Sequence, residues 1–480
     1  MGAGLACRMT RGSDPETGPE QSAAPRDTAP RAATAEGRAA EGRAAEGVAV
    51  AGATLGEAAA GGAAEGGAVS SPWAVLVRHA DFRRLLAGNT VSLLGSSVTT
   101  VALPLTAVVH LGASATEMGV LGALGLLPHL LLGLPAGVWI DRVPYRRAVV
   151  VADAVRVGLL GAVPVLAVFG GLRMWHLYVV VTLAGTAALV ESVAAQSFTP
   201  QLVPRERLLA ANSMLMLGNT TVGTVGSAVG GLLVSAFTAP VAIAVDAASF
   251  AVSSLLKARI RVEGRSPSGG ERRPVRLRAD VAEGLRAVFA HPVMRAVVLA
   301  ATVGAFAGSA QAVVLVLYLV RGLHLSPSLI GVLVATSGVA GVAGAAVATR
   351  VTRRLGPGPA FVAGMVLASV AGLVLAAAAG PFALVVAVVV LAQLLRGAGP
   401  SLYGVNQQTF RQALIPAELL SRANATWRFL AYGGQSLGAL AGGAAAAALG
   451  LRATLVVTSC VMLAGTAIGA ASPLRSLRRL

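Results

Sequence analysis

Two carboxylates and an arginine in this sequence could hold or move a proton, although each lies within a long apolar run. Asp153 and Arg156 are three positions apart, so on a helix they share a face and can pair. Asp246, in the stretch VDAASF, has no basic residue nearby in the sequence. Burial disfavours a charged carboxyl group, so such a residue could bind a proton and release it when water enters. These three residues are candidates for proton coupling. A neutral structural pair, and a plain hydrogen bond from Asp246 to a neighbouring helix, are the alternatives.

A second group of charges lies in the stretch GVWIDRVPYRRAVV, at residues 137–150. Asp141, Arg142, Arg146 and Arg147 fall within seven residues, in a chain whose charged residues amount to 12%. A charge at membrane depth is costly, so these side chains should lie at a membrane surface. The start of a helix favours a carboxylate such as that of Asp141. The cluster could therefore orient the chain, hold a contact closed at that surface, or do both.

Other polar residues within apolar runs could line a cavity that binds a solute. Arg396 could attract an anionic solute or pair with an acid. Because aromatic residues amount to only 4%, aliphatic and small side chains should form most of the walls. Such walls favour a lipophilic or amphipathic solute over a sugar. The candidates are Asn89, Ser96, Gln311, Tyr318, Gln393, Arg396 and Asn406.

Long apolar segments carry these residues. The chain is 55% hydrophobic with a mean hydropathy of +0.74, and an apolar run of about 18 residues or more is typical of a membrane-spanning helix. We therefore predict an integral membrane protein whose elements are all α-helical. The twelve predicted spans are 85–110, 117–140, 148–170, 174–197, 212–236, 240–257, 295–320, 326–349, 358–379, 381–406, 424–449 and 452–472.

The charge distribution predicts how the chain crosses the membrane. The net charge is +17, but the arginines lie in alternate short links between spans and not on one soluble face. This pattern argues against nucleic-acid binding. Cytoplasmic loops carry the excess of Lys and Arg, so we expect both termini in the cytoplasm and the protein in the plasma (inner) membrane.

The two halves of the chain resemble each other at a constant offset of 212 residues (408 − 196 = 212). The segment QSFTPQLVPRERLLAAN (196–212) aligns with QTFRQALIPAELLSRAN (408–424). A duplicated six-span unit predicts a site between the halves, near the middle of the membrane. We expect a disordered low-complexity tail containing AAEGRAAEGRAAEG. The expected parts are the tail (1–71), a first six-helix bundle (72–257), a cytoplasmic linker (258–290), and a second bundle with a short basic tail (291–480).

The stretch GVWIDRVPYRR resembles motif A of the major facilitator superfamily, in particular its drug- and siderophore-exporting branch. The stretches GNTVSLLGSSVTTVALPL, PQLVPRERLLAAN and VDAASFAVSSLL resemble the same branch. The resemblance covers the chain from about residue 72 onward. It implies the major facilitator fold, in which twelve transmembrane helices form two pseudo-symmetric six-helix bundles.

The resemblance also implies roles for the motif A residues, which begin at Gly137. Asp141 would cap the start of the eleventh span near Arg428, and Arg146 would pair with Glu191 in the fourth span. These contacts would hold the two halves together on the cytoplasmic side. The alternative is that the arginines, Arg142 and Arg147 included, only fix the orientation of the chain.

The fifth span contains GNTTVGTVGSAVGG, which resembles the glycine-rich motif C of antiporters. Gly226, Gly230 and Gly231 match the motif, but Ser227 stands where the proline is expected. Small residues let helices approach closely. An exporter-type hinge and ordinary tight packing are both consistent with this segment.

These observations predict a secondary active transporter that exports a small lipophilic or amphipathic molecule, such as a drug, macrolide or siderophore. Proton entry would drive export by alternating access. Uptake or facilitated diffusion, a membrane sensor that transports nothing, and an integral-membrane enzyme are the alternatives. The six histidines are scattered, and neither an H-E-x-x-H sequence nor a Walker A loop is present. We therefore expect no enzyme activity, metal or cofactor. The expected partners are a small-molecule substrate, protons and lipid, with the protein as a monomer.

Overall fold

A computed structural model describes residues 79–133, 136–140, 142–204, 207–264, 277–416 and 418–477. The predicted N-terminal tail (1–71) lies outside these residues, as does Asp141. Every regular element in the described part of the chain is a helix, which confirms the predicted all-helical class. The division into two bundles joined by a linker stays a prediction, and a helix, α10, occupies part of the stretch expected to be linker.

The described part of the first half contains seven α-helices. They are α3 (Ala80–Leu105), continued by the π-helical turn η1 (Thr106–His110), α4 (Ala115–Leu132), α5 (Ala136–Ile140), α6 (Tyr145–Val168), α7 (Met174–Leu202), α8 (Leu208–Ala236) and α9 (Ala239–Ala258).

The second half follows the same order after one additional helix. Its elements are α10 (Leu277–Ala290), α11 (Pro292–Leu317), continued by the π-helical turn η3 (Tyr318–Gly322), α12 (Pro327–Leu355), α13 (Pro357–Ala376), α14 (Phe382–Leu414), α15 (Leu420–Leu449), α16 (Leu451–Ala471) and the short η4 (Pro473–Ser476).

Helix boundaries repeat at the offset found in the sequence. Helix α3 begins at Ala80 and α11 at Pro292, which is again 212 residues later (292 − 80 = 212). The same offset relates the starts of α6 and α13, and those of the two π-helical turns. The duplication read from the sequence is therefore present in the helices themselves.

Ten helices in the described residues are long and apolar enough to cross a membrane, and each overlaps a predicted span. The other two predicted spans correspond to α8 and α15, helices of 29 and 30 residues that are not among those ten. Their sequences mix glycine with Asn, Ser, Thr and Gln, which lowers their mean hydropathy. Both helices pack against helices of both halves, so they need less lipid-facing apolar surface.

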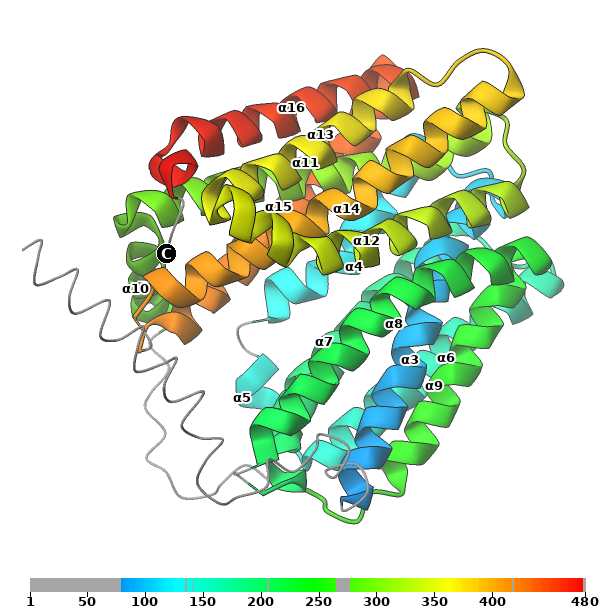
Figure 1. Ribbon diagram of the computed structural model, residues 1–480. Coiled ribbons are helices and arrows are strands. Elements are labelled where there is room, and N and C mark those ends of the chain that lie inside the picture. The colour runs from blue at the N-terminus through cyan, green and yellow to red at the C-terminus, as the bar shows by residue number, and fades with distance from the viewer. Residues whose placement is uncertain are drawn as a thin grey trace, which may run out of the picture. The chain divides into compact units, whose positions relative to one another are not determined.

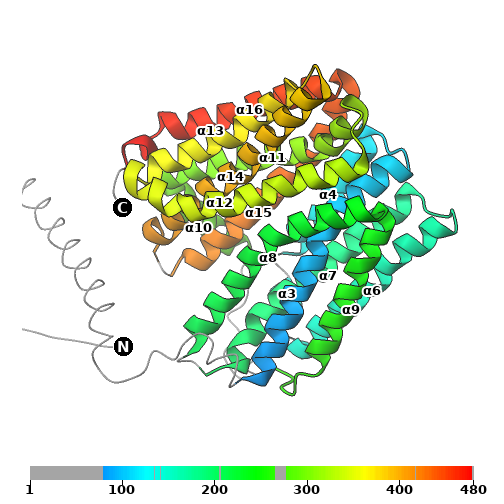
Figure 2. The ribbon, with the colours of Figure 1, turned by 45° about the vertical axis from the view of Figure 1, so that its right-hand side comes forward.

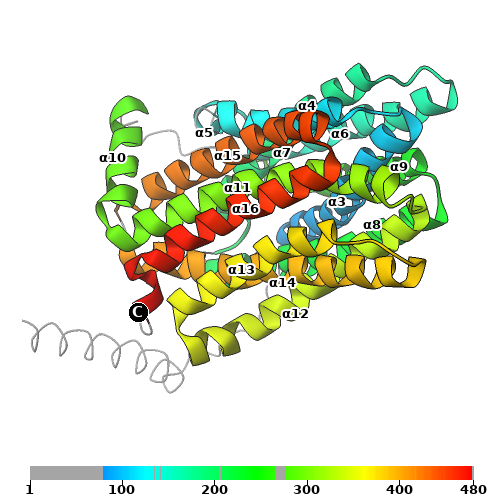
Figure 3. The same ribbon diagram turned by 90° about the horizontal axis from the view of Figure 1, so that it is seen from above.

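The halves meet along two helix pairs, α4 with α15 and α8 with α12. Within the first half, α3 packs against α8 and α9, and α6 packs against α7 and α9. The second half repeats this pattern with α11 against α15 and α16, and α13 against α14 and α16 (Figures 1 and 3). Figure 2 shows α8 and α12 side by side from a second direction.

Glycines allow the closest of these contacts. A Cβ atom on Gly443 of α15 would lie 2.7 Å from the Ala115 carbonyl oxygen and 2.8 Å from Gly119 Cα, both in α4. A Cβ on Gly230 of α8 would lie 2.9 Å from Val98 Cα in α3. Gly230 therefore packs tightly within the first half, and Gly226 also faces α3, at Ser97. The surroundings of Gly231 are outside the described set, and the hinge role stays a prediction.

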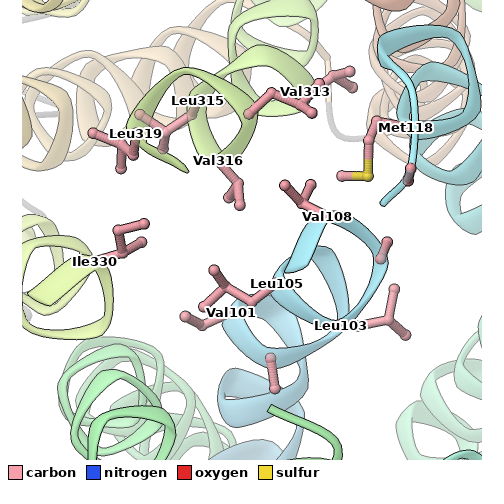
Figure 4. Close-up of a cluster of buried hydrophobic side chains, with 14 of the residues drawn as sticks. Val101, Leu103, Leu105, Val108, Met118, Val313, Leu315, Val316, Leu319 and Ile330 are labelled. Atoms are coloured by element: carbon pink, nitrogen blue, oxygen red, sulfur yellow. The ribbon is translucent and has the colours of Figure 1, made fainter. Parts of the chain in front are cut away.

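Apolar side chains from both halves gather at the end of the molecule that carries η1 and η3. Leu105 and Val108 from the first half lie near Val316 and Ile330 from the second, and all four are buried (Figure 4). A hydrogen bond 2.7 Å long joins the halves here, from the Arg321 guanidinium to the Ala113 carbonyl. We call these four apolar residues the apolar seal, and the opposite end, where α5 and α10 lie, the basic end.

Candidate functional site

A cavity of about 960 Å³ lies between the two halves. Helices α3, α4, α6, α7 and α9 line it from the first half, and α11, α12, α14 and α15 line it from the second. Most of the wall is apolar, and Val316 and Ile330 of the apolar seal form part of it. A space of this size accommodates a drug-sized molecule. Its location is the one that the duplicated sequence predicts.

Three of the seven predicted cavity-lining residues line this cavity: Ser96, Gln393 and Arg396. The other four are not among the residues that line it, so their role stays a prediction. Gln311 instead donates a hydrogen bond to Ser459 at 3.1 Å, and Tyr318 is buried in the apolar cluster near η3. Asn406 donates to the Leu402 carbonyl and accepts a hydrogen bond from Thr352.

Asn89 is the fourth of these residues. Its Oδ1 atom is buried without a hydrogen-bond partner in the described part of the chain, and it lies away from the cavity lining. A polar residue within an apolar run shows only that the residue is inside the membrane. It does not show which face of the helix points toward the cavity.

Four charged side chains form a network inside the first half, which we call the charge cluster: Asp153, Arg156, Glu191 and Lys257. The Lys257 ammonium donates to Asp153 at 2.9 Å and to Glu191 at 2.5 Å. Arg156 donates to Glu191 at 2.7 Å and lies 3.9 Å from Asp153. Two acids and two bases balance each other, so the cluster carries no net formal charge. This balance offsets the cost of burying each ion.

Three helices position the charge cluster. Asp153 and Arg156 come from α6, Glu191 from α7 and Lys257 from α9. Ser253, one turn before Lys257, also donates a hydrogen bond to Asp153, at 2.7 Å. Helix α3 leaves room for the lysine because its residue 88 is glycine, where a Cβ would lie 3.2 Å from the Lys257 side chain.

Lys257 is a candidate site residue that the sequence prediction missed, because it was predicted only as the last residue of the first bundle, next to the basic linker, and was given no role. It is the only lysine in the chain. A usable signal was present: Asp246, Phe250, Ser253 and Lys257 recur at helical spacing and therefore share one face of α9. Reading this face as a unit would have placed the lysine inside the bundle.

The partners expected for Glu191 need correction. Glu191 pairs with Arg156 and Lys257, and not with Arg146. Arg146 lies ten residues before Arg156 on the same helix, so it is about 15 Å further along the axis at 1.5 Å per residue. The predicted Asp153–Arg156 pair is present, but the closest basic partner of Asp153 is Lys257.

The remaining motif A residues lie at the basic end. Arg142 and Arg147 are exposed and Arg146 is half-buried, while the backbone N–H of Arg146 donates to the Glu263 carbonyl. Arg428, the expected neighbour of Asp141, is exposed on α15. Asp141 and the surroundings of Gly137 are outside the described positions, so the contact between the halves at this end stays a prediction.

Asp246 lines the cavity although it is only 1% exposed. It accepts a hydrogen bond from Thr99 of α3 at 2.5 Å and one from Ser249 at 3.2 Å. The guanidinium of Arg156 lies 4.7 Å from the ring centroid of Phe250, one turn after Asp246. Arg156 and Asp246 are thus both at the cavity wall, whereas Asp153 and Glu191 are not among its lining residues.

The second half places Gln393, Arg396, Tyr403 and Gln435 on the opposite wall. His129 of α4 also lines the cavity, and its ring lies 4.8 Å from that of Tyr432 on α15. The sequence prediction omitted His129, Tyr403 and Gln435. The polar groups of the cavity are therefore few and are divided between its two walls.

The chain matches the family model described as a transmembrane secretion effector over residues 70–479. It is similar to the multidrug efflux pump Tap of Mycolicibacterium fortuitum, with 27% identity covering 77% of this chain and 90% of the pump. Macrolide efflux protein A of Streptococcus pyogenes is 25% identical over 38% of this chain and 44% of that protein.

A crystal structure of a mutant of the nucleoside transporter NupG superposes with a TM-score of 0.66, although the sequence identity is 11%. The superposition covers 82% of this chain and 99% of that one, and it establishes the shared fold. With the ten apolar helices, the family match identifies a multi-pass membrane transporter and not an enzyme. The chain therefore belongs to the transmembrane secretion effector family of the major facilitator superfamily.

Proposed function

We propose that this protein exports a small lipophilic or amphipathic molecule across the plasma membrane, with its basic end in the cytoplasm. The cavity shared by the two halves, with its mainly apolar wall, is the observation that carries the proposal. The names of two relatives, a multidrug efflux pump and a macrolide efflux protein, support export as the direction.

Alternating access fits the way in which the halves meet. The apolar seal and the Arg321–Ala113 hydrogen bond join the halves at one end of the cavity. In the proposed cycle these contacts separate to release the cargo, while contacts at the basic end form, including those of motif A. Two similarly folded halves that rock around a shared site can exchange such contacts.

Asp246 is our candidate for the proton carrier. It lines the cavity, and its hydrogen bonds come from neutral hydroxyl groups and not from a basic side chain. Asp153 and Glu191 are each bound to Lys257 in the described structure. In the proposed cycle, a proton on Asp246 and the cargo occupy the cavity alternately.

Everted membrane vesicles provide the test. After acidification of the vesicle interior, a panel of macrolides, siderophores and dyes is added, and the pH gradient is followed with a fluorescent weak base. We expect at least one compound to accumulate inside and to dissipate the gradient. Asp246→Asn should abolish this response, and Asp153→Asn, at a carboxylate away from the lining, serves as the matched comparison.

Three outcomes would contradict parts of the proposal. Accumulation of the same compounds only in right-side-out vesicles would indicate uptake. Accumulation without a change in the gradient would exclude proton coupling. An undiminished response in the Asp246→Asn variant would exclude this residue as the carrier.

A further inference from the structure

Arg396 is a charged residue deep in the cavity that the export cycle above does not use. It lies near the middle of α14 (Phe382–Leu414) and lines the cavity. At 1.5 Å per residue, either end of this helix is about 20 Å or more away. An arginine near a helix end can extend its charged group to the membrane surface, but this arginine is too far from both ends to do so.

No acidic group balances Arg396 within the described residues. Neither an ion pair nor a hydrogen bond of its side chain is found there. A small hollow beside Arg396 is lined by Gln311 and Gln393, which are neutral. The cavity's carboxylate, Asp246, is on the wall formed by the first half and is held by Thr99 and Ser249.

Gln393, almost one turn before Arg396, is also incompletely bonded. Its side chain is 1% exposed and its Nε2 atom donates to the Leu333 carbonyl at 3.4 Å. Its Oε1 atom is buried without a hydrogen-bond partner in the described part of the protein. A buried polar atom left without a partner is costly. The wall around Arg396 thus contains an unpaired cation and an unsatisfied amide.

The hydrogen-bonding geometry of the Arg396 guanidinium group indicates which ligand group would bind beside it. An unpaired charge inside a membrane protein is expensive and marks a functional site by default. The planar guanidinium group matches a carboxylate, to which it can donate two parallel hydrogen bonds. The apolar residues that line the same cavity, Val334 and Leu315 among them, suit the hydrocarbon part of the same molecule.

We propose that the cavity binds amphipathic molecules that carry a carboxylate, and that Arg396 is the residue that binds this group. The inference rests on the proposed export function and names the substrate class of that site. Arg396 selects organic anions over neutral molecules of the same shape, while the apolar wall accepts different hydrocarbon skeletons.

Two fluorescent probes with the same fluorophore and chain test this inference: dansylaminoundecanoic acid and its primary amide. Binding to the purified full-length protein in lipid nanodiscs is followed by dansyl fluorescence at neutral pH, with empty nanodiscs subtracted. We expect the wild-type protein to bind the acid about tenfold or more tightly than the amide, because charge-assisted hydrogen bonds are the stronger class. Arg396→Gln should bind the acid only as tightly as the amide.

Two further variants separate recognition from folding. Arg396→Lys keeps the charge without the planar fork, so it should retain part of the preference for the acid. Arg173→Gln removes an exposed arginine outside the cavity and should leave both dissociation constants unchanged. Unchanged affinity for the amide shows that a variant still has a folded cavity.

Equal affinity of the wild-type protein for the two probes would overturn the inference, as would a preference for the acid that survives Arg396→Gln. The export of neutral dyes in vesicles reports separately on the proposed function. If dyes are exported but the acid is not preferred, only the carboxylate site is refuted. If nothing in the panel is transported, the export proposal itself fails.

Discussion

Replacing Lys257 with methionine should destabilise the first half of the protein strongly. The Lys257 side chain is fully buried and bonds both Asp153 and Glu191. Methionine has a similar length but no charge, so two buried carboxylates would share the single cation of Arg156. Arg156 already donates to Glu191 at 2.7 Å and lies 3.9 Å from Asp153. Asp153 would keep only the hydroxyl of Ser253 as a close partner.

The size of the effect follows from the burial of the pair. Removing one partner of a buried ion pair typically costs about 3–5 kcal/mol, because the other charge is left without compensation. For a large domain, about 2 °C of melting temperature is lost per kcal/mol. We therefore expect the apparent melting temperature to fall by roughly 6–10 °C. An ion pair near the surface is worth about 0–1 kcal/mol, so Arg84→Ala, which removes the partly exposed Arg84–Asp81 pair, is the matched control.

The measurement is thermal unfolding of the purified protein in detergent, followed by intrinsic fluorescence. Lys257→Met combined with Asp153→Asn restores charge balance and leaves the Arg156–Glu191 pair intact. The double variant should therefore melt at a higher temperature than Lys257→Met alone, which is a non-additive result. A Lys257→Met protein as stable as Arg84→Ala, or a double variant no better than the single one, would refute the charge-balance reasoning.

Three further predictions concern the contacts between the halves and their orientation. Arg321→Ala removes the hydrogen bond to Ala113, worth about 1 kcal/mol net, so a cysteine at position 101 should be labelled about fivefold more by an impermeant maleimide. Gly443→Val places side-chain atoms against α4, where even a Cβ would lie 2.7 Å from a backbone oxygen, and should lower stability by about 1–3 kcal/mol in thermal unfolding. A cysteine replacing Val143 should react with that reagent in everted vesicles and not in intact cells, since arginine-rich links face the cytoplasm.

The sequence predicts the helices well because apolar length and arginine distribution are properties of each segment alone. The boundaries are less accurate where a helix continues past its apolar run. The tenth span was predicted to end at residue 406, but α14 continues to Leu414. Its last turns carry Gln, Thr and Arg, which a hydropathy window excludes. The second predicted span, 117–140, is divided in the structure between α4 and α5.

The site was predicted less completely because pairing depends on how helices are rotated against one another. Asp153, Arg156 and Asp246 were recognised from the cost of charge within apolar runs. The role of Lys257 depends on contacts among α6, α7 and α9, and no local sequence pattern predicts that these three helices pack together. The hydrogen bond that Asn406 accepts from Thr352 of a neighbouring helix could not be predicted, for the same reason.

Comparison of the two halves indicates that the charge cluster is not required to hold its three helices together. At the 212-residue offset, Asp153 corresponds to Met365, Glu191 to Tyr403 and Lys257 to Gly469. The second half packs the equivalent helices with apolar and aromatic side chains, such as Tyr403, whose ring is 6.1 Å from that of Phe361.

An apolar arrangement therefore suffices to hold these three helices together, and apolar replacements of buried ion pairs are often neutral or stabilising. The charges of the first half are better explained by the cavity, which Arg156 and Asp246 reach from one wall. The opposite wall contributes Arg396, whose equivalent in the first half, Ala184, lines the same cavity without a charge. The two duplicated halves therefore share a similar helix arrangement but carry different charges at the cavity: Asp246 and Arg156 on the first-half wall, and Arg396 on the second-half wall. Under the two proposals above, a cargo in this cavity would lie between the proposed proton carrier Asp246 on one wall and the proposed carboxylate-binding Arg396 on the other.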